Sequence, residues 1–137
     1  MGFLYVARSA QVQDWAADVG LTLHVFKIGV ADDAEAVIAA LNEQSFAGAA
    51  DWKLVKKQAA DGIAEDAALE KLAKKEKAVD GALYPRLRGA SGMFKVKLTN
   101  VQTRMLVQRM MAGEEETSSR KPKVADIADY LIQSALG

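Results

Sequence analysis

Hydrophobic positions in the first half of the chain alternate with polar ones over short runs, a pattern that predicts strands. The run from Phe3 to Arg8 is rich in aromatic and β-branched residues, as buried strands are. Residues 21–30 alternate Leu21, Leu23 and Val25 with polar side chains. Trp52 and Leu54 share one face of a third run. We therefore predict strands over residues 3–8, 21–30 and 51–58.

Between these runs, apolar residues recur at helical spacing. Trp15 and Val19 predict a short helix or an ordered loop over residues 9–20. Asp32 or Asp33 can cap a helix that continues through Asn42. Its inner stripe holds Val37, Ile38 and Leu41. A longer helix is predicted over residues 63–79, with its lysines facing outward.

The second half is less regular before it becomes helical. Residues 84–97 are interrupted by proline and glycine, and residues 93–98 resemble a strand. Thr99 and Gln102 form a capping-box pattern ahead of a further helix. The inner set of this helix is predicted to be Val101, Met105, Leu106 and Met110. Met105, Met110 and Met111 are expected to pack in the core, although methionine-rich faces also suit grooves that bind proteins.

A polar stretch then separates a last amphipathic helix from the rest. This division predicts a domain over residues 1–112, a linker over 113–122 and a C-terminal helix over 123–137. The helix can fold back onto the domain, reach a second subunit or dock on another protein. The expected fold class is α/β (α+β): a small, mainly antiparallel three-stranded sheet flanked by helices, with the C-terminal helix appended.

The amino-acid composition excludes several kinds of chemical site. The chain of 137 residues has no cysteine, which excludes disulfides, thiolate metal sites and cysteine nucleophiles. Its apolar runs are shorter than the roughly 20 residues that a membrane span requires, and the N-terminus does not resemble a signal peptide. We expect a cytoplasmic protein of bacterial or phage type that does not bind a membrane.

Charge is unevenly placed although the net charge is zero. Residues 1–69 carry five basic and ten acidic side chains, whereas residues 70–137 carry thirteen and eight. Residues 71–109 contain ten basic side chains and two acidic ones, Glu76 and Asp80. Such a concentration indicates a polyanion-binding surface, and the alternative is an ordinary solvated face.

Several short fragments along residues 2–98 form an ordered set. They are Gly2-Phe3-Leu4-Tyr5-Val6, Phe26-Lys27-Ile28-Gly29, Val37-Ile38-Ala39-Ala40-Leu41-Asn42, Trp52, Leu69-Glu70, and the basic run from Arg86 to Phe94. In their order, and in the eight-residue step from Gly29 to Val37, they resemble the GIY-YIG nuclease superfamily, specifically its phage-type branch. In the last of these, Gly92-Met93 replaces the family's Glu-Trp pair.

The resemblance implies a site on the sheet surface. Tyr5 keeps the first family tyrosine, which helps to orient the attacking water, and Lys27 stands where the second would be. Glu70 corresponds to the carboxylate that holds a divalent metal such as Mg²⁺. The arginine that stabilises the transition state is replaced by Val37.

Valine carries no charge and donates no hydrogen bond. Loss of an arginine aimed at a phosphoryl transition state costs about 10³–10⁵ in rate in well-studied cases. Arg8, Arg86 or Arg88 could replace it only if the fold held one of them to within about 0.5 Å of the required place. The resemblance therefore implies a degenerate member with no catalytic residues and no cofactor.

Other readings of the same residues stay open. His24 has no second histidine to form a metal site and is expected to be structural. Tyr5 can be a strand core residue. Glu70 can pair with Lys74 at the i,i+4 spacing.

The favoured hypothesis is a module that binds nucleic acid, DNA in the first place, through the basic region and the former active-site face. The residues expected to bind it are Tyr5, Arg8, Lys27, Arg86, Arg88, Lys95 and Lys97. A protein-interaction or regulatory module that retains only the fold is the alternative, with a partner or a second copy on the C-terminal helix. A slow metal-dependent endonuclease with a relocated arginine is the third.

Overall fold

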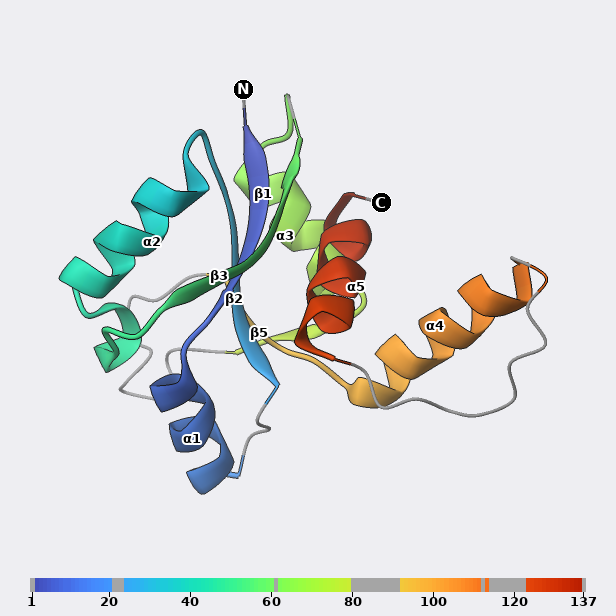
Figure 1. Cartoon of the computed structure of the whole chain (residues 1–137), viewed down its shortest axis with the longest axis horizontal. Helices are drawn as coiled ribbons and strands as arrows, with labels where there is room; N and C mark the ends of the chain where they lie inside the picture. The colour runs from blue at the N-terminus through green and yellow to red at the C-terminus, as the bar shows by residue number, and fades with distance from the viewer. Residues whose placement is uncertain are drawn as a thin grey trace.

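An antiparallel sheet of five strands forms the centre of the described chain, in the order β3-β1-β2-β5-β4 (Figure 1). The computed structural model describes residues 2–20, 24–60, 62–79, 92–111, 113 and 123–136. The strands are β1 (Phe3–Arg8), β2 (Val25–Ala31), β3 (Lys53–Ala59), β4 (Lys77–Ala78) and β5 (Met93–Lys95).

The first two predicted strands pair with each other, in the antiparallel sense expected for the sheet. In β1 and β2, Tyr5 lies opposite Gly29 and Ala7 opposite Lys27. The predicted strand over 51–58 is confirmed as β3. The predicted start of the second strand at residues 21–23 lies outside the described residues. The prediction of a three-stranded sheet is wrong. The sheet has two further strands, because β5 pairs with the free edge of β2 and β4 pairs with β5.

Helices cover both faces of this sheet. The helices of the described residues are α1 (Ala10–Asp18), α2 (Ala34–Glu43), a short 3-10 helix η1 (Phe46–Gly48), α3 (Glu65–Ala73), α4 (Leu98–Met111) and α5 (Val124–Leu136). Helices α1 and α2 lie on one side of the sheet, and α3 and α5 lie on the other (Figure 1). Asp33 caps α2 as predicted, since its side chain accepts a hydrogen bond from the Ala36 amide.

Strand alternation divides the core in two. Leu4, Val6, Phe26 and Ile28 point to the face covered by α3 and α5. Ala7, Val25, Trp52 and Met93 belong to the second cluster, under α1 and α2. Odd-numbered residues of β1 and β2 therefore face α2, and this places Tyr5, Lys27 and Gly29 on that side.

The C-terminal helix is part of the first core rather than an extension from it. Ile127, Leu131, Ile132 and Ala135 of α5 are buried against the sheet and α3. Of the three placements that the sequence allows, the structure shows the one in which the helix folds back. The predicted linker lies outside the described residues, apart from Gly113.

Helix α4 packs at its start and extends away from the body at its end (Figure 1). Val101 is buried and Met105 is packed against the core. Met110 and Met111 are 67% and 84% exposed. The prediction that these two methionines pack in the core is wrong, because helical periodicity cannot tell where the protein beneath the helix ends.

The long helix predicted over 63–79 ends early. Helix α3 stops at Ala73, and the amides of Lys75 and Glu76 both donate to the Leu72 carbonyl as the chain turns. The Glu76 carboxylate, only 4% exposed, then accepts the Lys97 amide at 2.7 Å and the Asn100 side-chain amide at 2.8 Å. A buried carboxylate with these partners at the start of α4 outweighs the helix propensity of a lysine-rich segment.

Replacing Glu76 should therefore destabilise the fold. In Glu76→Ala, the Lys97 amide and the Asn100 side chain lose their shared acceptor in a buried setting. We expect the free energy of unfolding to fall by about 3 kcal/mol, measured by urea denaturation. Glu70→Ala, on the exposed face of α3, is the matched control and should change it by about 0.5 kcal/mol or less. Equal losses in the two variants would contradict this account of where α3 ends.

Candidate nucleic-acid interface

A cleft of about 890 Å³ lies where the end of α3 and strands β4 and β5 meet the start of α4. Five of its twelve lining residues are lysines. We call it the lysine cleft, after Lys74, Lys75, Lys77, Lys95 and Lys97. Glu76 and His24 also line it. The structure thus brings the sequence-predicted Lys95 and Lys97 together with three lysines that had not been assigned to a site.

The sheet register explains part of this concentration. Lys77 of β4 lies directly opposite Lys95 of β5. Like charges placed opposite each other across an antiparallel pair are destabilising by roughly 0.2–1 kcal/mol. The turn after α3 adds Lys74 and Lys75 beside them. The arrangement is unfavourable in the free protein and becomes favourable when an anion lies between the side chains.

Within the described residues, none of the five cleft lysines takes part in an ion pair. Other basic side chains do: Lys56 contacts Asp129 at 2.8 Å and Lys57 contacts Glu35 at 2.8 Å. The carboxylate of Glu76 at the cleft is already bonded to the start of α4. The positive charge of the cleft is therefore available to a ligand.

A second group of polar side chains lies over Gly29 on the α2 face of the sheet. We call it the Tyr5 cluster: Tyr5, Lys27, Gly29 and Glu65. A methyl group placed on Gly29 would lie 2.5 Å from the Tyr5 hydroxyl and 2.6 Å from a Glu65 carboxylate oxygen. Glu65, at the start of α3, also accepts the Val30 amide at 3.1 Å. Only glycine at position 29 leaves room for both oxygens.

Burial shifts the pKa of two side chains in this cluster. The side chain of Tyr5 is 3% exposed, and burial, followed by the Glu65 charge, raises the pKa of Tyr5 to about 12. Lys27 is 6% exposed, and burial lowers its pKa while the Glu65 carboxylate opposes the shift. Its ammonium lies 5.8 Å from the Tyr5 ring centre and 5.5 Å from that of Phe46.

The cluster and the lysine cleft share one face of the sheet. Lys27 lies opposite Met93, and Lys95 lies opposite Val25, so Lys27 and Lys95 are diagonal neighbours across β2 and β5. In the backbone register, Lys95 therefore lies on the same face of the sheet as Tyr5 and Lys27. The exposed lysines and the buried one nevertheless have different surroundings.

The remaining predicted residues are scattered. Val37 is half-buried and packs against the core under α2. Arg8 lines a cavity of about 240 Å³ with Phe26 and Ile127, on the opposite face from Tyr5. It therefore does not replace the missing arginine. Arg86 and Arg88 lie outside the described residues.

Glu65, not Glu70, is the carboxylate beside Tyr5. Glu70 is exposed one helical turn further along α3, where it lines a depression with Asp66 and Gly92. The sequence offered no signal for Glu65, because its partner is a strand amide 35 residues away. No three Asp, Glu or His side chains gather as a metal site in the part of the chain that the structure describes. Metal binding at Glu70 stays a prediction.

Comparisons with protein-family models, with curated proteins and with solved structures find no match to this chain. No described helix has both the length and the apolar character needed to cross a membrane. The functional argument therefore rests on the geometry of the two sites.

The close approach over Gly29 can be tested by substitution. Gly29→Ala should lower the free energy of unfolding by about 1–3 kcal/mol, because the new methyl overlaps the Tyr5 hydroxyl and the Glu65 carboxylate. The double variant Tyr5→Phe/Gly29→Ala should recover part of this loss, since the hydroxyl is gone. Thermal or urea unfolding measures both.

Gly2→Ala is the matched control, because its added methyl would meet its nearest atom at an ordinary 3.5 Å. It should change the free energy of unfolding by about 0.5 kcal/mol or less. If Gly29→Ala behaves like this control, the packing described over Gly29 is wrong.

Proposed function

We propose that this protein binds nucleic acid, in the first place DNA, through the lysine cleft. The observation that carries the proposal is the opposition of Lys77 and Lys95 across paired strands, with three more lysines around the same cleft that form no ion pair with any described residue. Phosphate groups are the ligands that best relieve such repulsion. Flexible lysines bind them as point charges.

The contacts that such a cleft offers are to the backbone of the nucleic acid. Phosphate contacts fix position and orientation and carry little sequence information. Binding would therefore depend on charge rather than on base sequence. Arg86 and Arg88 remain part of this proposal, as does a cytoplasmic location. Arg8 faces the opposite side of the sheet, so it does not belong to the cleft.

From the GIY-YIG resemblance we propose that the protein has a degenerate fold of that type and descends from a nuclease. Val37 packs as an apolar residue where the family has its arginine. Tyr5 and Lys27 lie together on one face, but both are buried. A slow metal-dependent nuclease is the less favoured alternative.

A protein-interaction module is the second candidate, and one observation favours it. The outer end of α4 exposes Leu106, Val107, Met110 and Met111. A protruding apolar helix end is typical of a surface that contacts another protein. The apolar face of α5, which the sequence offered for this purpose, is already buried in the core.

Salt dependence tests the favoured function. Binding of the full chain to a labelled DNA duplex, measured by fluorescence anisotropy, should weaken steeply between 50 and 200 mM salt. Each phosphate contact adds about 0.9 to the slope of log K against log salt. Lys95→Glu/Lys97→Glu should weaken binding about tenfold at low salt and flatten the slope by nearly 2, for unrelated DNA sequences alike.

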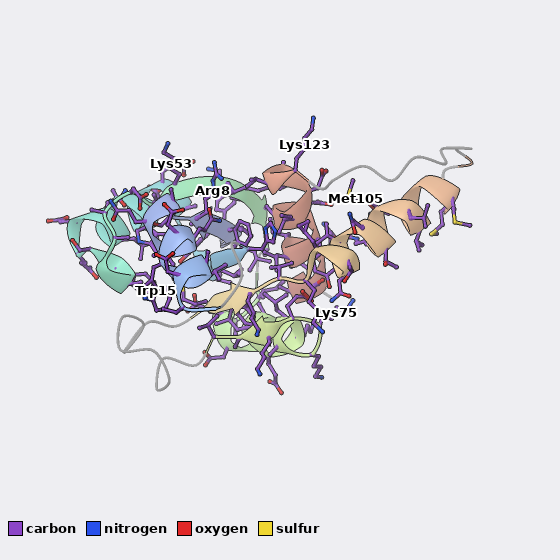
Figure 2. The ribbon with its side chains drawn as sticks, turned by 90° about the horizontal axis from the view of Figure 1, so that it is seen from below. Arg8, Trp15, Lys53, Lys75, Met105 and Lys123 are labelled. Atoms are coloured by element: carbon purple, nitrogen blue, oxygen red, sulfur yellow. The ribbon has the colours of Figure 1, made fainter. Side chains whose placement is uncertain are left out.

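The matched control is Lys53→Glu/Lys123→Glu, which makes the same change in net charge outside the cleft. Figure 2 shows both of these side chains on the side of the molecule opposite Lys75. This variant should keep most of the wild-type affinity. Equal weakening in both variants would mean diffuse attraction rather than a site. No binding at 50 mM salt would favour the interaction module.

Catalysis is tested separately. With Mg²⁺ or Mn²⁺ present, the protein should not cleave duplex or single-stranded DNA above background, because Val37 leaves the developing phosphate charge unsupported. Val37→Arg is expected to restore trace activity at most, since Lys27 and Gly92-Met93 also depart from the family pattern. Metal-dependent cleavage that Glu70→Ala abolishes would instead establish the nuclease alternative.

A further inference from the structure

A smaller cavity, of about 240 Å³, lies at the end of β1, on the face of the sheet opposite Tyr5. We call it the Arg8 cavity. Arg8 lines it from β1, Gln13 and Asp14 line it from α1, and further residues come from β2 and α5. Its lining shares only His24 with the lysine cleft, so the two are separate sites. Its volume lies below the roughly 300–1,000 Å³ of pockets that hold drug-sized ligands, so a ligand here must be small.

Two opposite charges lie at the rim of this cavity. Arg8 is half-buried and Asp14 is exposed, so both side chains reach solvent. They are not within ion-pair distance of each other, and neither side chain bonds to any other residue that the structure describes. The nearby Asp51 differs, because its carboxylate already accepts the Ser9 hydroxyl and the Gln11 amide. A ligand that carries a negative and a positive group can therefore bind both rim charges at once.

The inner surface of the cavity is apolar. Phe26 of β2 and Ile127 of α5 are 1% and 2% exposed, and the half-buried Val124 at the start of α5 also lines it. Phe26 and Ile127 belong to the first core, which fixes their positions. An apolar surface beneath a few convergent polar groups is the usual form of a small-molecule site.

We propose that the Arg8 cavity binds a free α-amino acid with an apolar side chain, of the size of valine or leucine. The Arg8 guanidinium binds the ligand carboxylate through two parallel hydrogen bonds, the geometry that arginine favours. Asp14 accepts hydrogen bonds from the ligand ammonium group. The ligand side chain packs over Phe26, Val124 and Ile127. In an α-amino acid one carbon carries both charged groups, so they can reach a cation and an anion on the same rim.

Ligands with a single charge suit this cavity less well. A simple carboxylate would be repelled by Asp14, and a simple amine would be repelled by Arg8. A nucleic-acid strand is too large for about 240 Å³, and Asp14 would repel its phosphates. Lys53 lies opposite Arg8 across β1 and β3 but does not line the cavity, so it supplies a control for the charge of this strand pair.

Titration of the ¹⁵N-labelled full chain, followed through its amide chemical shifts, tests the proposal. L-Leucine should shift the amides of Arg8, Gln13 and Asp14 saturably, with a Kd of about 1 mM or lower, which is within reach of a ligand this small. Two analogues of leucine each lack one charge: 4-methylpentanoate has no ammonium group, and 3-methylbutylamine has no carboxylate. Each should bind at least tenfold more weakly than leucine. Glycine, which lacks the apolar side chain, should bind at least fivefold more weakly.

Two substitutions separate the roles of the rim charges. Arg8→Gln should weaken leucine binding at least tenfold and should not weaken the binding of 3-methylbutylamine, which has no carboxylate to lose. Asp14→Asn should weaken leucine binding at least fivefold and should not weaken the binding of 4-methylpentanoate. Lys53→Gln is the matched control, because it removes a positive charge directly opposite Arg8. It should keep the leucine affinity within about twofold, and the amide spectrum of each variant reports whether the fold is retained.

Three outcomes would overturn the proposal. Leucine may give no saturable shift up to about 20 mM, or Arg8→Gln and Lys53→Gln may weaken its binding equally. If 4-methylpentanoate binds as tightly as leucine, the cavity is a carboxylate site and not an amino-acid site. The titration contains no nucleic acid, so its result does not depend on the function proposed for the lysine cleft.

Discussion

The buried carboxylate of Glu76 is the interaction on which the rest of the second half depends. It accepts hydrogen bonds from the Lys97 amide, the Asn100 side chain and, at 3.3 Å, the Tyr130 hydroxyl. These donors belong to the approach to α4, to α4 itself and to α5. One charged group therefore fixes where α3 stops, where α4 starts and how α5 lies beside them. Moving a charged group from water into the protein interior costs free energy, and short hydrogen bonds to the carboxylate offset this desolvation.

The lysine cleft is a consequence of the same contact. Because the chain leaves α3 to place Glu76 inside, Lys74 and Lys75 fall on the turn and Lys77 enters a strand beside Lys95. The negative charge of Glu76 lies among these five lysines and reduces their mutual repulsion. It does so without occupying the lysine ammonium groups, since its oxygens are committed to other donors. Glu76 therefore holds the cleft in shape without forming an ion pair with the lysines that line it.

The sequence predicted those features that depend on local periodicity. Alternating or β-branched runs identified residues 3–8 and 51–58 as strands, and Asp33 identified the start of α2, because these signals lie within a few residues of the feature they set. Residues 93–98 were expected to resemble a strand, and Met93–Lys95 form one, but its place in the sheet was not predicted. The strand Lys77–Ala78 was missed, because two residues are too short to show alternation and they form a strand only through their pairing with β5.

The candidate sites show the same division. All five cleft lysines belong to the stretch 71–109 whose charge predicted a polyanion-binding surface. Only Lys95 and Lys97 were named as binding residues, because Lys74, Lys75 and Lys77 were placed on the outer face of a helix that in fact ends at Ala73. Glu65 was missed because its contacts to Val30 and to the space over Gly29 exist only after α3 packs against β2. Contacts between segments that are far apart in the chain produce no regular spacing of residues, so the sequence alone does not reveal them.

The lysine cleft and the Tyr5 cluster place lysine in physically different surroundings, although Lys27 and Lys95 are diagonal neighbours. The cleft lysines line an open surface. Under the proposed function, salt in solution would screen their attraction for phosphate beyond roughly 8–10 Å. Lys27 is buried, and burial lowers its pKa. An enclosed group is screened much less, so a change in ionic strength should act on the cleft far more than on Lys27. Lys27 and Lys95 lie on the same face of β2 and β5, so strand alternation does not separate them. They differ because the rings of Tyr5 and Phe46 lie over Lys27, whereas Lys95 lines the cleft. What covers each side chain, and not its place in the strand, therefore sets its exposure.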